Sequence, residues 1–258
     1  MSAAVELVDF SVTHWHGPLA DRAIQLLGAG KLTLHGLLPW SSNYTFLGEV
    51  ADAQGNALVV YKPTRGERPL WDFPKGTLAK RETAAYVLSR ALTWDLVPPT
   101  VVRRGPHGRG SVQLFVDADQ DAHFFTFRED PAYWPALQAL ALFDVIANNA
   151  DRKGGHCLSL GSGHIVAIDQ GLCFSVESKL RTVIWDFVGE PIPVQLDSDL
   201  RRVHDELSRP GSPLVSQLQG LLSRLELEAM QVRVAGLLVC GRFPDPPTDR
   251  RPYPWPLV

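Results

Sequence analysis

The chain has 258 residues, of which 45% are hydrophobic and 21% are charged, so it can bury one large core or two lobes and is neither disordered nor fibrous. Its net charge of −3, without basic runs interleaved with aromatics, argues against a nucleic-acid partner. Three widely spaced cysteines, and no stretch near the roughly 20 apolar residues of a membrane helix, favour a cytoplasmic protein without integral membrane association.

Strand patterns dominate the first 118 residues and predict a sheet-rich N-terminal lobe. A helical pattern at residues 19–27 comes first. The strand patterns that follow cover residues 32–38, 44–50 and 57–61, and two more strands flank residues 104–110. Between them, apolar residues at Ala85, Leu88 and Leu92 have helical spacing.

Residues 119–242 predict a mainly helical second lobe. Residues 135–146 are apolar nearly all round, which is typical of a buried helix. A short buried strand is expected at residues 163–168, and helical patterns follow at 198–207 and 213–238. The last segment, residues 243–258, carries six prolines and predicts an extended tail.

Two acidic residues and a lysine in the second lobe indicate phosphoryl transfer. Asp151 lies in a polar loop after the apolar helix, where a carboxylate can accept the proton of an attacking hydroxyl. Lys153 is close enough in sequence to neutralise the γ-phosphate of ATP. Asp169 ends the apolar strand, where a carboxylate can hold Mg²⁺. Together they predict a kinase that uses ATP and Mg²⁺.

Each residue alone also has a plain structural interpretation. A loop Asp followed by Arg and Lys is most often a solvated turn, and a lone Asp169 is more often a turn residue. A lysine before a proline ordinarily ends an exposed strand. The order of the motifs along the chain is what favours the nucleotide site over these interpretations.

These motifs, together with Val60-Tyr61-Lys62-Pro63 upstream, resemble the phosphatidylinositol 3-/4-kinase-like branch of the protein-kinase superfold, in particular its small bacterial members. The resemblance extends over residues 32–193. It implies a single α+β kinase-like domain with two lobes, a sheet-rich N-lobe at residues 1–118 and a mainly helical C-lobe at 119–242.

The resemblance also implies roles for further residues. Lys62 would bind the α- and β-phosphates, and Glu82 would orient that lysine. Val116 would contact the adenine edge. The residues of the serine-bearing loop that would contact phosphate through hydroxyls and backbone amides are Ser41, Ser42 and Asn43.

One position departs from the family pattern. The residue five places after the base is normally an asparagine that binds metal, and here it is His156. Imidazole is a softer ligand than an amide oxygen, so His156 predicts a preference for Mn²⁺, a single metal ion, or a histidine outside the metal shell.

The expected activity is transfer of the γ-phosphoryl group of ATP to an alcohol. The resemblance implies an inositol lipid or related polyol as acceptor, and a protein serine or threonine hydroxyl is the nearest alternative. The partner is thus a small molecule, a lipid headgroup or a protein hydroxyl. His156 also leaves open a pseudokinase that only binds nucleotide, and nucleotidyl transfer is a third alternative.

Overall fold

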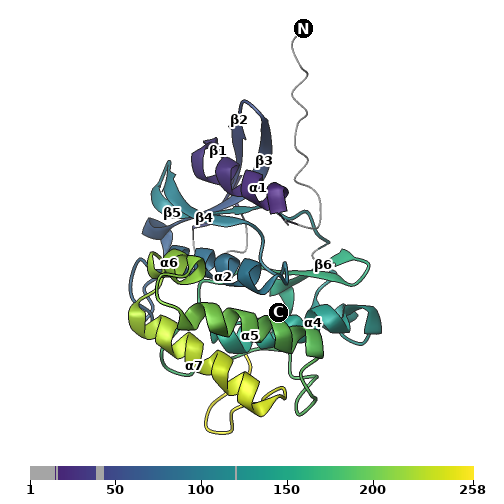
Figure 1. Cartoon of the computed structure of the whole chain (residues 1–258). Coiled ribbons are helices and arrows are strands. Elements are labelled where there is room, and N and C mark those ends of the chain that lie inside the picture. The colour runs from purple at the N-terminus through teal and green to yellow at the C-terminus, as the bar shows by residue number, and fades with distance from the viewer. Residues whose placement is uncertain (1–14, 16, 39–43, 120) are drawn as a thin grey trace. The chain divides into compact units, whose positions relative to one another are not determined.

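The computed structural model describes residues 15, 17–38, 44–119 and 121–258 (Figure 1). The predicted phosphate-contacting residues Ser41, Ser42 and Asn43 lie outside these ranges. The chain divides into two compact units. Unit 1 comprises Met1–Thr83 and Pro98–Asp117, and unit 2 comprises Ala84–Val97 and Ala118–Val258. The lobe boundary at residue 118 stays a prediction.

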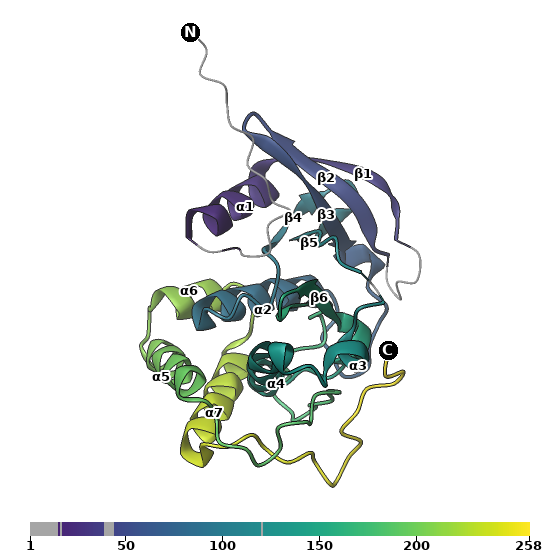
Figure 2. The same cartoon turned by 90° about the vertical axis from the view of Figure 1, so that its right-hand side faces the viewer.

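Unit 1 is built on a five-stranded antiparallel sheet with the order β1-β2-β3-β5-β4 (Figure 2). The strands are β1 (Lys31–Leu37), β2 (Phe46–Asp52), β3 (Gly55–Pro63), β4 (Thr100–Gly105) and β5 (Gly108–Leu114). Helix α1 (Gly17–Ala29) contacts β2, β4 and β5. All five strands and this helix confirm the elements expected from the sequence.

Alternation along β3 explains which face of the sheet is buried. Ala57, Val59 and Tyr61 are buried, whereas the residues between them are partly or fully exposed. This period of two residues is the one expected of a strand that covers a core on one face. Lys62 follows Tyr61 and therefore points to the opposite face.

Helix α2 (Leu78–Leu92) begins in unit 1 and ends in unit 2. Helix α2 is preceded by a 3-10 turn, η1 (Thr64–Gly66), which follows β3. The α2 residues Ala85, Leu88 and Leu92 are fully buried, which confirms the helical spacing seen in the sequence. Glu82 is also buried, with 3% of the residue exposed, although a helix glutamate is usually solvated.

Unit 2 is mainly helical and contains one β-hairpin (Figure 1). Its helices after α2 are α3 (Phe124–Phe127), α4 (Trp134–Ala147), α5 (Val194–Ser208), α6 (Pro213–Gln219) and α7 (Arg224–Cys240). The hairpin strands are β6 (Cys157–Gly161) and β7 (His164–Ala167), and single 3-10 turns lie at Pro131–Tyr133 and Gly154–His156. Helix α4 contacts α7 and β7, and α5 contacts α6 and α7.

The helical pattern expected over residues 213–238 is two helices rather than one. Helix α6 ends at Gln219 with Gly220 as its C-cap. Helix α7 starts after Ser223, whose hydroxyl accepts the amide of Glu226 while the Glu226 carboxylate accepts the amide of Ser223. This reciprocal capping box begins a new helix and explains the break.

Helix α4 is the buried helix of unit 2, as its sequence predicts. Leu137, Leu140, Leu142, Phe143 and Ile146 are all completely buried.

None of the helices in the ranges that the structure describes has the length and hydropathy that a bilayer-spanning segment needs.

Residues 243–258 form no helix or strand and run along other parts of unit 2. Gly189 donates its amide to the Phe243 carbonyl at 3.1 Å, and Thr182 donates to the Pro252 carbonyl at 3.0 Å. Near the end, the Leu257 carbonyl accepts the amide of Gly154 at 2.7 Å. The tail is therefore hydrogen-bonded to the loop that follows α4 and to the segment between β7 and α5.

Candidate active site

In unit 1, strand β3 and helix α2 bring a lysine and a glutamate together. Lys62 pairs with Ser111 of β5 near the end of β3, and its Nζ lies 2.7 Å from Oε1 of Glu82. The Glu82 side chain is only 4% exposed and that of Lys62 is 24% exposed. A buried carboxylate with a charged hydrogen bond holds the lysine in one orientation. Their predicted roles in nucleotide binding stay predictions.

The residue expected at the adenine edge also lies in unit 1. Val116 comes just after β5 in a segment without regular structure, and it is partly buried. The preceding residue, Phe115, donates its amide to the Leu58 carbonyl at 2.9 Å, so this segment continues alongside β3. The role of Val116 stays a prediction.

In unit 2, the loop that carries Asp151 begins with a left-handed turn. Asn148 ends α4 with φ 50° and ψ 53°, a conformation that asparagine tolerates better than most residues. Its side-chain amide donates to the carbonyls of Ser175 and Glu177, and its side-chain oxygen accepts the amide of Lys179. The buried Asn148 therefore ties the start of the loop to residues 175–179.

Asp151 and Lys153 form an ion pair just beyond this turn. Lys153 Nζ lies 3.1 Å from Oδ2 of Asp151, and the side chains of Lys153 and Asp151 are 21% and 25% exposed. The Asp151 amide donates to the side-chain oxygen of Asn149. Partial burial raises the pKa of Asp151, and the charge of Asp169 adds to this, although Lys153 acts in the opposite direction. A carboxylate whose proton affinity is raised in this way is a better base.

His156 and Asp169 approach each other at the end of the hairpin. His156 Nε2 lies 3.7 Å from Oδ2 of Asp169, which has a positive φ of 59° directly after β7 and Ile168. His156 Nδ1 lies 3.0 Å from the carbonyl oxygen of Asp151 and 3.5 Å from the amide nitrogen of Lys153, so a hydrogen-bond acceptor and a donor both face this ring nitrogen. Nε2 faces the Asp169 carboxylate.

The structure thus brings four predicted residues of unit 2 into one neighbourhood: Asp151, Lys153, His156 and Asp169. Within the described ranges, no group of three or more His, Cys, Asp or Glu side chains is arranged to hold a metal ion. Two protein donors are nevertheless enough for Mg²⁺, which is usually bound by one or two carboxylates together with substrate phosphates. Asp169 supplies one such carboxylate, and the imidazole of His156 is a softer donor that suits Mn²⁺ better than Mg²⁺.

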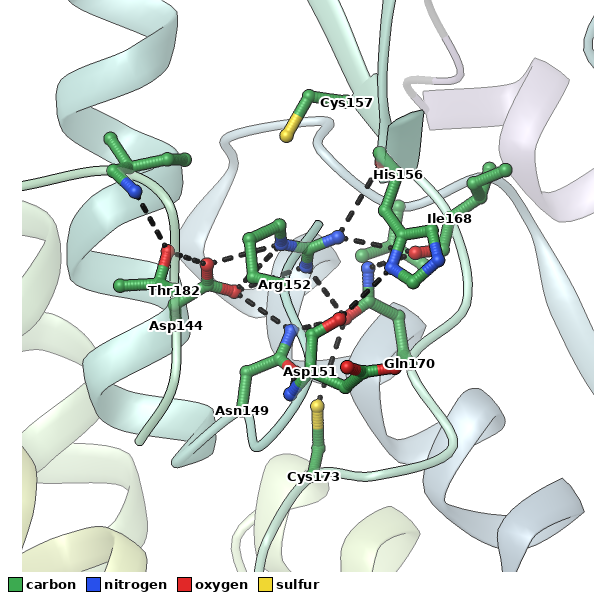
Figure 3. Close-up of polar contacts among 12 residues, drawn as sticks. Asp144, Asn149, Asp151, Arg152, His156, Cys157, Ile168, Gln170, Cys173 and Thr182 are labelled. Atoms are coloured by element: carbon green, nitrogen blue, oxygen red, sulfur yellow. Dashed lines mark hydrogen bonds and ion pairs between the residues drawn. The ribbon is translucent and has the colours of Figure 1, made fainter. Parts of the chain in front are cut away.

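Beneath this group lies a buried arginine for which the sequence predicts no role. The Arg152 and Asp144 side chains are both 0% exposed. Arg152 Nε lies 3.1 Å from both carboxylate oxygens of Asp144, and Nη2 lies 3.0 Å from Oδ1 (Figure 3). Although burial opposes its charge, the Asp144 carboxylate raises the pKa of Arg152, so the guanidinium stays protonated.

Arg152 also joins the Asp151 loop to the strand that ends at Asp169. Its Nη1 donates to the Ile168 carbonyl at 3.1 Å, and Nη2 donates to the side-chain oxygen of Gln170 at 2.8 Å. These acceptors flank Asp169 in the chain. The guanidinium therefore binds the backbone just before the candidate metal ligand and the side chain just after it, and Arg152 itself belongs to the loop that carries the candidate base.

Asp144 has further partners, so its charge is well compensated. Thr182 donates its hydroxyl to Oδ2 at 3.0 Å, and Asn149 donates its side-chain amide to Oδ1 at 3.0 Å. A signal for this cluster was present in the sequence, because an aspartate inside an otherwise apolar helix must find a cation when it is buried. The identity of that cation could not be read from the sequence.

Comparison with known proteins identifies a relative in sequence and similar solved structures. No protein-family model matches the chain. It is 40% identical over 271 residues to Protein Rv2133c of Mycobacterium tuberculosis (strain ATCC 25618 / H37Rv), and the match covers 92% of this chain and 96% of that protein. The chain belongs to the Rv2133c family.

Two solved structures are similar to this member of the Rv2133c family. Hydra Fam20, solved with a sugar, has a TM-score of 0.51 at 15% identity, with 86% of this chain and 88% of that chain covered. The Golgi casein kinase has a TM-score of 0.50 at 14% identity, with 86% and 76% covered. At these identities the similarity establishes the fold, which is α+β and kinase-like.

Proposed function

We propose that the chain is an ATP-dependent phosphotransferase that moves the γ-phosphoryl group to an alcohol. The observation that carries this proposal is the arrangement of Asp151 and Asp169 around the buried Arg152 in a kinase-like fold. Asp151 takes the proton of the acceptor hydroxyl as the acceptor oxygen bonds to the γ-phosphorus. The bond from that phosphorus to the β–γ bridging oxygen breaks, and ADP leaves with the electron pair.

The other residues hold the nucleotide. Lys62, fixed by Glu82, binds the α- and β-phosphates, and Lys153 neutralises charge on the γ-phosphoryl group. Asp169 and His156 hold the divalent ion, Mg²⁺ or Mn²⁺, which supplies charge neutralisation at the phosphates when it is bound. Ser41, Ser42, Asn43 and Val116 complete the proposed nucleotide contacts.

We further propose that the chain falls in the phosphatidylinositol 3-/4-kinase-like branch and that its acceptor is an inositol lipid or a related polyol. The motif order from Lys62 to Asp169 supports this. A protein serine or threonine hydroxyl is the rival acceptor, because one structure with this fold is named a casein kinase.

A second candidate function is a nucleotide-binding module without turnover. It is favoured by His156, which stands where related kinases have a metal-binding asparagine and which lies 3.7 Å from Asp169. A metal shell with a softer donor can support nucleotide binding and yet be poor at transfer.

Label transfer distinguishes these functions. With γ-labelled ATP, a panel of metabolites, lipids and peptides should identify an acceptor, and Asp151→Asn and Asp169→Asn should each abolish the transfer. Transfer of label only from α-labelled ATP would indicate nucleotidyl transfer. Nucleotide binding without any transfer would leave the binding module.

The metal assignment can be tested on the same assay. His156→Asn restores a harder oxygen donor, so we expect it to keep or improve activity with Mg²⁺ relative to Mn²⁺. An unchanged ratio of the two activities would remove His156 from the metal shell.

A further inference from the structure

A cavity of about 240 Å³ opens in unit 2 beside the loop that carries Asp151. Three separate segments of the chain line it. Phe125 and Arg128 come from α3 and its C-cap, Trp185 and Asp186 come from the segment between β7 and α5, and Tyr253 comes from the tail.

The walls of this cavity touch the Asp151 loop directly. Val183 donates its amide to the Arg152 carbonyl at 3.2 Å, and the Leu257 carbonyl accepts the Gly154 amide. Gly154 also lies so close to the Phe125 ring that a Cβ atom there would be 2.7 Å from two ring carbons. Residues that line the cavity therefore contact Arg152 and Gly154, which are the neighbours of Lys153 in the chain.

The polar groups of the cavity suit a neutral ligand. Arg128 Nη1 lies 3.7 Å from Oδ1 of Asp186, and the two side chains are 39% and 30% exposed, so both reach solvent. Their charges cancel, which disfavours a strongly anionic or cationic occupant. A guanidinium only donates hydrogen bonds and a carboxylate only accepts them, whereas a hydroxyl group does both.

The remaining lining residues and the size of the cavity narrow the class of ligand further. The rings of Phe125, Trp185 and Tyr253 offer flat apolar faces. The volume of about 240 Å³ lies below the usual range for drug-sized ligands and suits one compact ring.

We propose that this cavity binds the acceptor of the phosphoryl group and that the part of the acceptor bound here is a compact, uncharged ring with several hydroxyl groups. The inference rests on the proposed phosphotransferase function. The aromatic rings contact the faces of the ring, and the Arg128–Asp186 pair binds its hydroxyls. The tail supplies Tyr253 and Leu257 and so completes the binding site.

Ligand-observed NMR on the full chain tests this proposal, with myo-inositol and D-glucose as probes. At least one probe should bind, and Asp186→Asn should weaken that binding roughly tenfold, because it removes a charged acceptor. Tyr253→Ala should also weaken it. Asp197→Asn is the matched control, since it disrupts an exposed ion pair with Arg201 on α5 and should leave binding unchanged.

The outcomes separate the cavity from the phosphotransferase function. If neither probe binds, the cavity is not the acceptor site. The same conclusion follows if the Asp186→Asn and Asp197→Asn variants bind a probe equally well. Either result leaves the phosphotransferase function standing as long as consumption of ATP still depends on Asp151. If a probe binds but never receives label from γ-labelled ATP, the cavity is not the acceptor site. The phosphotransferase function fails only if no acceptor in the panel of metabolites, lipids and peptides receives label.

Discussion

Arg152 shows how one buried side chain can position a site without touching the reacting groups. It bonds Asp144 below it and the backbone beside Asp169, and both members of the pair are completely buried. Replacing one member of such a pair leaves the other charge buried without its partner, which is more damaging than replacing both.

We therefore expect Arg152→Met to lower the free energy of unfolding by about 3–5 kcal/mol, because Asp144 keeps only its hydrogen bonds from Thr182 and Asn149. Urea denaturation measures this loss. Adding Asp144→Leu to Arg152→Met should recover part of it. The exposed pair on α5 gives the control, since Arg201→Met should cost less than about 1 kcal/mol.

The raised pKa of Asp151 has a consequence for activity. The base must be ionised, so transfer should fall as the pH drops through a pKa that lies above the ordinary 3.8. Because Lys153 lowers this pKa, Lys153→Met should move the acid limb of the kcat/KM profile to higher pH. An acid limb that does not move in Lys153→Met would contradict the pairing.

The same shift has the opposite effect on stability. The folded chain binds the Asp151 proton more tightly than the unfolded chain, so this carboxyl lowers the stability as the pH rises from 3.8 through its raised pKa. Asp151→Asn should remove that slope from the stability measured by urea denaturation over this range.

At the scale of elements, helix α4 presents the Asp151 loop, and α7 supports its end. Arg233 on α7 donates from Nε to the Ile146 carbonyl at 2.8 Å in the last turn of α4. A cation at the C-terminus of a helix also interacts favourably with the helix dipole. Burial lowers the pKa of Arg233 to about 10, so it is still charged at neutral pH.

Arg233→Met should therefore loosen the end of α4. Loss of the donor leaves the Ile146 carbonyl without this partner, and we expect a cost of about 1–3 kcal/mol in unfolding free energy. Hydrogen exchange should be faster at Asn148 and Asn149, whose amides bond to the last turn of α4. Equal exchange at these amides in the variant and the wild type would show that α7 does not support the loop.

The elements themselves could largely be predicted from the sequence, although α3 and β6 were not predicted and residues 213–238 form two helices. Helices α1, α2 and α5 and the strands of unit 1 follow apolar periods of 3.6 or 2 residues, which depend only on local geometry, and α4 was predicted because its segment is apolar nearly all round. The division of residues 213–238 into α6 and α7 does not alter the apolar pattern. It depends on the Ser223–Glu226 capping box, which the period alone does not reveal.

At the scale of the whole molecule, the proposed nucleotide residues belong to both compact units. Lys62 and Glu82 are in unit 1, and Asp151 and Asp169 are in unit 2. Binding of ATP to the folded state should raise the thermal midpoint, by the equivalent of about 2.7 kcal/mol at a hundredfold excess over Kd.

Thermal-shift measurements with ATP and Mg²⁺ then distinguish binding from chemistry. Wild type and Asp151→Asn should both be stabilised, because Asp151 acts on the acceptor proton. Lys62→Met should lose most of the shift, because Lys62 holds the phosphates. An undiminished shift in Lys62→Met would reject its assignment.

The sequence by itself determined most of the elements, the kinase-like order of the motifs and the residues that could carry the chemistry. These properties follow from local periodicity and residue type, and both are present along the chain. Only the tertiary structure decided that Arg152 is buried against Asp144 and that the tail reaches the Asp151 loop. Burial and long-range pairing depend on which distant segments pack together, and an arginine in a polar loop has the same sequence signature whether it is solvated or buried.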